Sequence, residues 1–181
     1  MDRADSLGES VNAGDILRDV LDHGLSVIFC GSAVGNYSAR TGSYYAHPQN
    51  KFWPILFETG LTSELLPSSR YRELPTYGIG LTDLVKSQSG VDHEISFAIT
   101  RAESRQRLQR SIEQYEPRIL AFTSKKAGQE FLGDNKLFGE QAETIGNTHI
   151  WILPSTSSAA RKHWQPDIWH ALANRIRATS G

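Results

Sequence analysis

The chain has 181 residues, 39% hydrophobic and 22% charged, which suits one globular domain with a sizeable core and is too short for two. The formal net charge of −1 does not point to a nucleic-acid partner, although an enzyme that needs only a local basic rim can still bind DNA. The sequence has no apolar run near the roughly eighteen residues of a membrane span and no signal segment, so we expect a cytoplasmic protein that does not bind membranes. The single cysteine, Cys30, excludes an internal disulfide and a paired-cysteine zinc site.

Hydrophobic periodicity predicts alternating helices and strands after a polar tail at residues 1–12, all within one domain at residues 13–181. Helical spacing predicts a helix at 13–23 that stops at Gly24, and a short apolar run predicts the first strand at 25–30. The remaining strands are predicted at 77–82, 118–123 and 149–153, and the remaining helices at 61–66, 101–115, 124–133 and 167–177.

One further helix is predicted towards the end of the long loop that follows the first strand. Pro48 can open this helix at its first turn, but Pro54 would then lie inside it, so the helix starts early with a kink or starts near Pro54. Residues 87–99 show no clear pattern. The alternation of strands and helices predicts an α/β fold, a three-layer α/β/α domain around a central, mainly parallel, four-stranded sheet.

The loop after the first strand, residues 31–53, shows no helical periodicity and holds the residues from which we expect the chemistry. In open α/β sheets, ligands bind beyond the carboxyl ends of the strands, and glycines such as Gly31 and Gly35 let the backbone approach a ligand closely. Four aromatic side chains flank the segment Ala-His-Pro-Gln-Asn: Tyr44, Tyr45, Phe52 and Trp53. Flat rings beside amide and imidazole groups are what a protein needs to hold a nucleobase.

Three stretches, in order, resemble motifs of the uracil-DNA glycosylase superfamily. GSAVGNYSARTGSYYAHPQNKFW, residues 31–53, resembles the region of the mismatch-specific uracil and thymine branch that runs from G-I-N-P-G through T-G to H-P-x-N-x-F-W. It also resembles the hypoxanthine branch, which begins G-S and carries Y-Y. LAFTSKKA, residues 120–127, resembles A-F-N-G-K-K-A of the hypoxanthine branch, and LPSTSSAAR, residues 153–161, resembles both L-P-S-T-S-P-A of that branch and N-P-S-G-L-S-R of the mismatch branch. The resemblance covers about residues 25–175.

The resemblance implies a site that binds a deaminated base flipped out of DNA. The base would stack on Tyr45, and backbone N–H groups of Ser32, Ala33 and Val34 would bind its carbonyl oxygen as negative charge develops. Gly31 and Thr123 complete this predicted base site. For Tyr45 the alternative is ordinary core packing.

Water would then attack C1′ of the sugar. Asn50 is the first candidate to position that water or to read the base edge, because its amide both donates and accepts, with Asn36 second and His47 third. The alternative for Asn50 is that it only caps the helix that follows. Asp83, at the end of the second strand, is expected to organise backbone, with a catalytic role as its alternative.

Contacts with the DNA backbone are expected from the second and third motifs. The predicted residues are Ser155, Ser157, Arg161, Lys162 and Lys125. Arg161 aligns with the final arginine of a loop that inserts into DNA in the mismatch branch. A solvated surface is the alternative for each charge taken alone.

Several positions depart from the motifs, and the departures bear on mechanism. Ala33 stands where the mismatch branch has the asparagine that orients the hydrolytic water, and Val34 replaces the following proline. Thr123 and Ser155 each stand where a branch has asparagine. Excision at a reduced rate remains possible, because fixed dipoles that stabilise the leaving group need no strong base.

The sequence therefore predicts a monofunctional DNA glycosylase that hydrolyses the N-glycosidic bond of uracil in DNA and leaves an abasic site. We expect it to act as a monomer on DNA that contains a deaminated base, with no cofactor and no metal. Two alternatives stay open: excision of hypoxanthine, and binding of a lesion or abasic site without catalysis.

Overall fold

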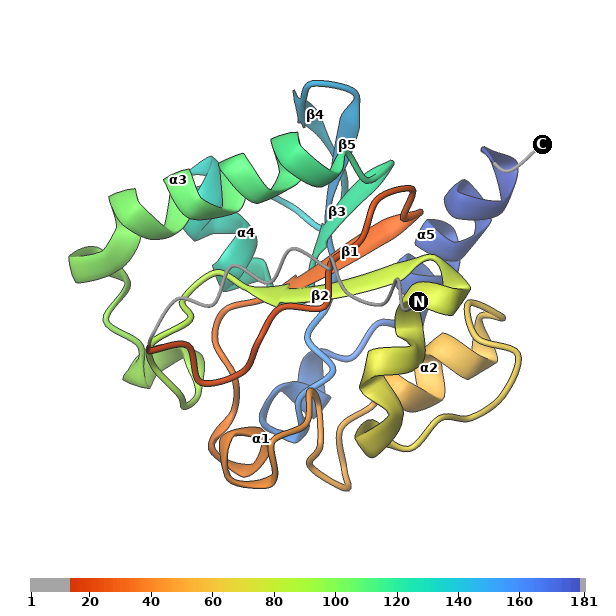
Figure 1. The fold of residues 1–181 in the computed structure, drawn as a ribbon, viewed down its shortest axis with the longest axis horizontal. Coiled ribbons are helices and arrows are strands. Elements are labelled where there is room, and N and C mark those ends of the chain that lie inside the picture. The colour runs from red at the N-terminus through yellow and green to blue at the C-terminus, as the bar shows by residue number, and fades with distance from the viewer. Residues whose placement is uncertain (1–13, 180–181) are drawn as a thin grey trace, which may run out of the picture.

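The computed structural model describes residues 14–179, so the predicted tail at residues 1–12 lies outside the described residues. A five-stranded sheet of order β2-β1-β3-β5-β4 forms the centre of the domain (Figure 1). Its strands are β1 (Val27–Gly31), β2 (Ile79–Asp83), β3 (Ile119–Phe122), β4 (Gly139–Ile145) and β5 (Thr148–Ile152). Strands β1, β2, β3 and β5 pair in parallel, as predicted. Each of their observed ends lies one or two residues from the predicted end.

The fifth strand, β4, corrects the predicted four-stranded sheet. It lies at the sheet edge and pairs antiparallel with β5 after a two-residue turn in which Gly146 has a φ of 54°. Its sequence, GEQAETI, is polar until Ile145, and its residues alternate between half-buried and exposed. Such an edge strand carries no apolar run, so hydrophobic patterning could not find it.

Helices cover both faces of the sheet and make the predicted three layers (Figure 1). The α-helices are α1 (Asn36–Thr41), α2 (Phe52–Glu58), α3 (Phe97–Tyr115), α4 (Lys125–Leu132) and α5 (Pro166–Ala178), and short 3-10 helices span Ser68–Tyr77, Asp92–Glu94 and Ser158–His163. Alternate residues of β1 enter separate cores: Phe29 packs with α2 and α5, and Ile28 packs with α3 and α4. No helix among residues 14–179 is long and apolar enough to cross a membrane.

Two predicted helices are wrong, and tertiary contacts explain the first. The described part of residues 13–23 is not helical; instead Val20 pairs antiparallel with Leu81, each N–H donating to the other's carbonyl at 2.8 Å. Since β2 is otherwise an open edge, this segment satisfies backbone groups that a helix would leave exposed. Residues 61–66 form bends rather than a helix.

The long loop also differs from its prediction. It contains the six-residue helix α1, which ends at Gly42 in the left-handed conformation, φ 70°. The helix after it, α2, begins at Phe52, so Pro54 lies in its first turn, where a missing N–H breaks no helical hydrogen bond. The delayed start was therefore the correct alternative. The fourth helix is capped as its sequence predicted: Ser124 Oγ accepts from the N–H of Ala127 at 3.0 Å.

Replacing Gly128 with alanine tests how closely α4 packs on β5. An added Cβ would lie 2.5 Å from Cδ1 and 2.6 Å from Cγ1 of the buried Ile152. We expect Gly128→Ala to lower the free energy of unfolding by about 1–3 kcal/mol, measured by urea denaturation, because overpacking forces side chains from their rotamers. An unchanged midpoint would show that Ile152 can move aside without cost.

Candidate active site

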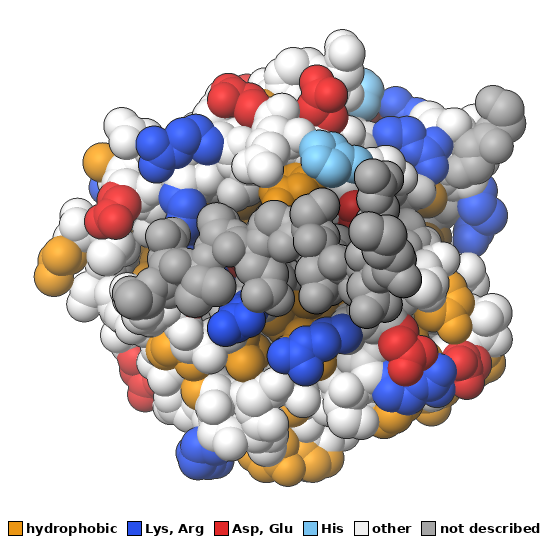
Figure 2. Space-filling model, viewed as in Figure 1, with side chains coloured by type: hydrophobic (Ala, Val, Ile, Leu, Met, Phe, Trp, Pro, Cys, Tyr) orange, Lys and Arg blue, Asp and Glu red, His pale blue; other side chains and the backbone are white. Residues whose placement is uncertain are grey.

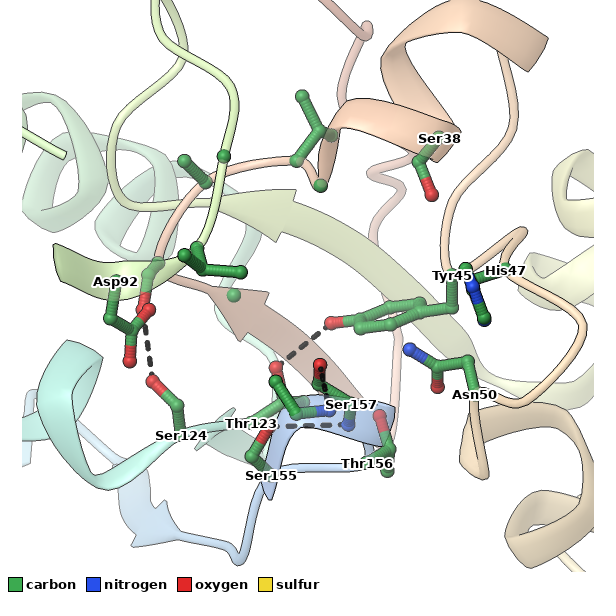
Figure 3. Close-up of a pocket in the computed structure, with 18 of the residues that line it drawn as sticks. Ser38, Tyr45, His47, Asn50, Asp92, Thr123, Ser124, Ser155, Thr156 and Ser157 are labelled. Carbon is green, nitrogen blue, oxygen red and sulfur yellow. Dashed lines mark hydrogen bonds between the residues drawn. The ribbon is translucent and has the colours of Figure 1, made fainter. Parts of the chain in front are cut away.

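A cavity of about 470 Å³ opens at the carboxyl ends of the parallel strands (Figure 3). Its volume falls within the roughly 300–1,000 Å³ of small-molecule sites. It brings together these residues predicted from sequence: Gly31, Ser32, Ala33, Val34, Asn36, Tyr45, His47, Asn50, Thr123, Ser155 and Ser157. Lys125, Arg161 and Lys162 do not line it.

Tyr45 is fixed from two sides. Its ring stacks on Phe52, with centroids 3.9 Å apart and planes at 18°, and its hydroxyl lies 2.9 Å from Oγ1 of Thr123. The backbone at Tyr45 has a φ of 51°, a left-handed conformation that is uncommon for a large side chain. Burial, with the charge of Asp83, raises the pKa of Tyr45, so its hydroxyl stays protonated and can donate. The ring is thus a rigid wall of the cavity, with Phe52 packed behind it.

Asn50 makes a structural hydrogen bond through its amide oxygen and also lines the cavity. Its Oδ1 accepts from the N–H of Phe52 at 2.9 Å, at the start of α2, which is the contact that the helix-cap alternative requires. Its Nδ2 makes no hydrogen bond within residues 14–179, and Figure 3 draws this nitrogen pointing towards Tyr45. Asn50 therefore offers the cavity its Nδ2 donor, and its Oδ1, which has two lone pairs, already holds the N–H of Phe52.

The two lower-ranked catalytic candidates lie at the exposed rim. His47 packs edge-to-face on Tyr37, with centroids 5.4 Å apart, and its Nδ1 accepts from the N–H of Gln49 at 3.1 Å. Asn36, the first residue of α1, accepts from the Ser89 hydroxyl at 3.0 Å. These contacts leave both side chains at the cavity but use part of their hydrogen-bonding capacity.

The backbone after β1 is held by the segment after β2. The carbonyls of Gly31 and Ser32 accept from the N–H groups of Leu84 and Val85, each at 2.8 Å, and the carbonyl of Val34 accepts from Gly90 at 3.0 Å. The Ser32 hydroxyl meets that of Ser124 at 2.9 Å. This loop is therefore a fixed part of the cavity wall, as a set of preorganised backbone donors would need to be.

Asp83 is the buried charge of the site. It lines the cavity at the end of β2, is 4% exposed, and its Oδ2 has no hydrogen-bond partner within residues 14–179. The nearest cation, Nζ of Lys86, is 4.0 Å from Oδ2. Burial raises the pKa of Asp83 to about 6 although Lys86 and Arg107 oppose the rise. No backbone N–H of residues 14–179 donates to its Oδ2, so among the described residues the expectation that it organises backbone was wrong.

The segment that the sequence left unassigned, residues 87–99, closes one side of the cavity. Gly90, Val91, Asp92 and His93 line it there. No sequence pattern marked these residues, because residues 87–96 are irregular apart from one short 3-10 helix, and α3 begins only at Phe97. Within residues 14–179, no three His, Cys, Asp or Glu side chains gather as a metal site.

Comparison with known proteins identifies the family. The model of the Uracil DNA glycosylase superfamily matches residues 18–173, which is most of the chain. This chain belongs to the uracil DNA glycosylase superfamily. It is therefore a DNA glycosylase, a hydrolase that acts on DNA.

The fold of this glycosylase is also found in a solved structure. A proposed uracil DNA glycosylase from Methanosarcina acetivorans, determined by solution NMR, superposes with a TM-score of 0.58 and 22% sequence identity. The similarity covers 89% of this chain and 96% of that one. At this identity the comparison concerns the fold, and it supports the α/β architecture described above.

The basic residues predicted to contact DNA lie outside the cavity lining of the glycosylase. Arg161 and Lys162 lie in the last turn of the 3-10 helix that borders the cavity, and both are exposed, as is Lys125. On the face in Figure 2, visible Lys and Arg side chains are scattered among acidic and apolar ones. The Ser157 hydroxyl accepts from the N–H of Ala159 at 3.3 Å, and that of Ser155 accepts from the N–H of Ser157 at 3.2 Å, so both shape this loop. Phosphate contacts by these residues remain predictions.

The buried carboxyl of Asp83 gives the stability of this glycosylase a defined pH dependence. Its pKa is higher in the folded chain than the usual 3.8, so the folded state binds the proton more tightly and stability falls as pH rises from about 4 to about 6. The variant Asp83→Asn has no carboxyl group to ionise at this position, so its stability does not fall for this reason as pH rises. We expect the variant to gain up to about 3 kcal/mol over the parent between these pH values, measured by urea unfolding. Parallel pH profiles would contradict the raised pKa.

Proposed function

We propose that this glycosylase hydrolyses the N-glycosidic bond of uracil in DNA, as a monomer and without a cofactor or metal, and leaves an abasic site. The observation that carries the proposal is the cavity itself: a space large enough for a nucleobase, with a fixed tyrosine ring on one wall and the amide nitrogen of Asn50 beside it. Stacking and hydrogen bonding to the base edge are how proteins read a base extruded from the helix.

In this mechanism the flipped base stacks on Tyr45 and its carbonyl oxygen meets the backbone N–H groups of residues 32–34. The bond between the base nitrogen and C1′ breaks as negative charge moves onto the base, which those dipoles stabilise. Water adds to C1′, and the proton that it loses balances the departing base. Ala33, which is half-buried and lines the cavity, offers no polar side chain for this step.

The chemistry of its amide limits what Asn50 can do. A carboxamide is too weak a base to take the proton of water, and its Oδ1 also holds the N–H of Phe52. Its Nδ2 can donate to the water oxygen or to a base carbonyl. The proposed reaction therefore depends on positioning and fixed dipoles, with no general base at residues 33 or 50.

Hypoxanthine is the second candidate substrate, because the cavity volume of about 470 Å³ also accommodates a purine. A panel of oligonucleotides distinguishes the candidates. Each carries one uracil, hypoxanthine, thymine or xanthine, single-stranded or paired, and strand cleavage by alkali reports abasic sites. Release of uracil in the presence of a chelator supports the proposal. Faster release of hypoxanthine would reverse the ranking, and binding without release of any base would make the protein a lesion binder.

Replacing Tyr45 tests the stacking wall. Tyr45→Ala should weaken excision by the loss of one base stack, roughly 1–3 kcal/mol, and Tyr45→Leu should retain more activity than Ala. Tyr45→Phe is the matched control, because it keeps the ring on Phe52 and loses only the bond to Thr123. Single-turnover excision and thermal unfolding are measured together. If Tyr45→Ala unfolds the protein, the ring is core packing; native excision by a folded Ala variant would refute stacking.

Two substitutions separate the roles of Asn50. Asn50→Asp keeps an oxygen for the N–H of Phe52 but removes the Nδ2 donor, and Asn50→Ala removes both. We expect both variants to excise uracil about 10²-fold more slowly or worse, the usual loss for a positioned group, with DNA binding kept. Only Asn50→Ala should lower the melting temperature. Normal excision by both variants would leave Asn50 as a helix cap alone.

A further inference from the structure

The backbone is fixed on both sides of Tyr45. Before it, the carbonyl of Tyr44 accepts from Nε1 of Trp53 at 3.3 Å. After it, the N–H of Ala46 donates to Oγ of the buried Ser38 at 3.0 Å. Tyr45 itself has a φ of 51°, a conformation that costs free energy in a large side chain and persists where its neighbours hold it. The place of the Tyr45 ring therefore depends on what fixes residues 44 and 46.

Tyr44 is tied to a buried lysine. Tyr44 is 1% exposed, and its hydroxyl donates to the carbonyl of Arg18 at 3.1 Å while it accepts from Nζ of Lys86 at 3.1 Å. The same ammonium forms an ion pair with Oδ1 of Asp19 at 2.8 Å. The segment of Arg18 and Asp19 runs alongside β2, and the N–H of Ile16 donates to the carbonyl of Lys86 at 3.0 Å. Lys86 thus joins the loop after α1 to this segment.

Folding alone does not explain a lysine at this position. The side chain of Lys86 is 5% exposed, and it is not among the described residues, 14–179, that line the cavity. Buried ion pairs are often no more stable than apolar residues of similar volume, and in some proteins they serve instead to select one arrangement of the chain. An apolar pair in place of Lys86 and Tyr44 would fill the space, but it would make no directional contact to fix residue 44.

We propose that Lys86 is a positioning residue: through the hydroxyl of Tyr44 it holds the Tyr45 ring where a flipped base stacks. The inference rests on the proposed function. Phe52, with its centroid 3.9 Å away, and Thr123, at 2.9 Å from the hydroxyl, fix the ring itself, whereas Lys86 fixes the backbone that carries it. A ring that samples several places binds a base more weakly, because only the competent fraction of molecules stacks.

NMR tests this positioning without any substrate. The protein is labelled with ¹⁵N-tyrosine, and the Tyr45 amide signal is identified by its absence from Tyr45→Phe. Relaxation dispersion, which detects exchange on the μs–ms timescale, should find none at Tyr45 in the parent. Tyr44→Phe and Lys86→Met should both introduce it. Tyr44→Phe keeps the ammonium and Lys86→Met keeps the phenol, so the change they share is the loss of the bond between Nζ and Oη.

Excision measures whether this order matters to the reaction. Each variant should excise uracil about 10-fold more slowly in single turnover, as expected from weakening one base stack. In a Tyr45→Ala background the same substitutions should cause no further loss, because no ring is left to position. This comparison matters because Tyr44 lines the cavity and Lys86 carries a charge, and a direct effect of either would persist without the Tyr45 ring.

Thr148→Val is the matched control. It removes a buried hydroxyl that donates to the carbonyl of Pro117 at 2.6 Å, at the start of β5 and so at the opposite end of the sheet from the cavity. The variant should melt at a lower temperature, yet show no exchange at Tyr45 and excise uracil at the parent's rate. Should Lys86→Met fail to fold, Tyr44→Phe removes a single oxygen atom, breaks the same bond and decides the question alone.

The outcomes separate the inference from the proposed function. If the parent excises no base but both substitutions introduce exchange at Tyr45, the proposed function fails and the positioning role stands. If the parent excises uracil and neither substitution introduces exchange, the inference is overturned and Lys86 only stabilises the fold. Exchange at Tyr45 with unchanged excision, or an equal loss of excision with and without the Tyr45 ring, overturns it as well.

Discussion

The missing side chain at Gly31 is the constraint on which the site depends. Strand β1 lies between β2 and β3, and its register places Gly31 opposite Asp83. Any Cβ at this position would collide with the Asp83 carboxylate at 2.6 Å. Because it is glycine, the carboxylate can lie directly beneath the start of the loop that carries Tyr45 and Asn50. The cavity thus has a polar floor at the point where an ordinary central strand would place an apolar side chain.

Charges of both signs surround Asp83. Asp19 reaches Lys86 at 2.8 Å, Arg107 at 3.4 Å and the hydroxyl of Thr82 at 2.7 Å, and it does so because its segment runs alongside β2 instead of forming a helix. Buried ionic clusters are often no more stable than apolar residues of the same shape. At the edge of this cluster, Oδ2 of Asp83 has no donor within residues 14–179, which costs stability unless a ligand supplies one.

The sequence predicted the features that depend on local pattern. Apolar runs located the four parallel strands, and Ser124 marked the start of α4. The motif resemblance selected residues such as Tyr45 and Asn50, which the fold does bring to one cavity. Features set by distant contacts were missed. The polar edge strand β4 has no apolar pattern, and the segment at 13–23 keeps helical spacing while pairing with β2.

The same contrast between local pattern and distant contacts decided which functional groups could be predicted. The position of Asn50 follows from its motif, but the bond of its Oδ1 to the N–H of Phe52 appears only in three dimensions, and with it the direction in which Nδ2 points. Asp83 was visible only as the last residue of a strand. Its burial depends on the parallel register with β1 and on Arg107, 24 positions away, which donates to its backbone carbonyl; no local pattern encodes either.

A carboxylate at the floor of the site opposes the departure of the base. Negative charge develops on the departing base, and an ionised Asp83 beside it raises the energy of that state, while Lys86 at 4.0 Å offsets only part of the repulsion. Ala33 offers the water no polar side chain, and the carboxamide of Asn50 is too weak a base to take its proton. We therefore expect slow excision, because the charge of Asp83 opposes the leaving group while residues 33 and 50 do not activate the water.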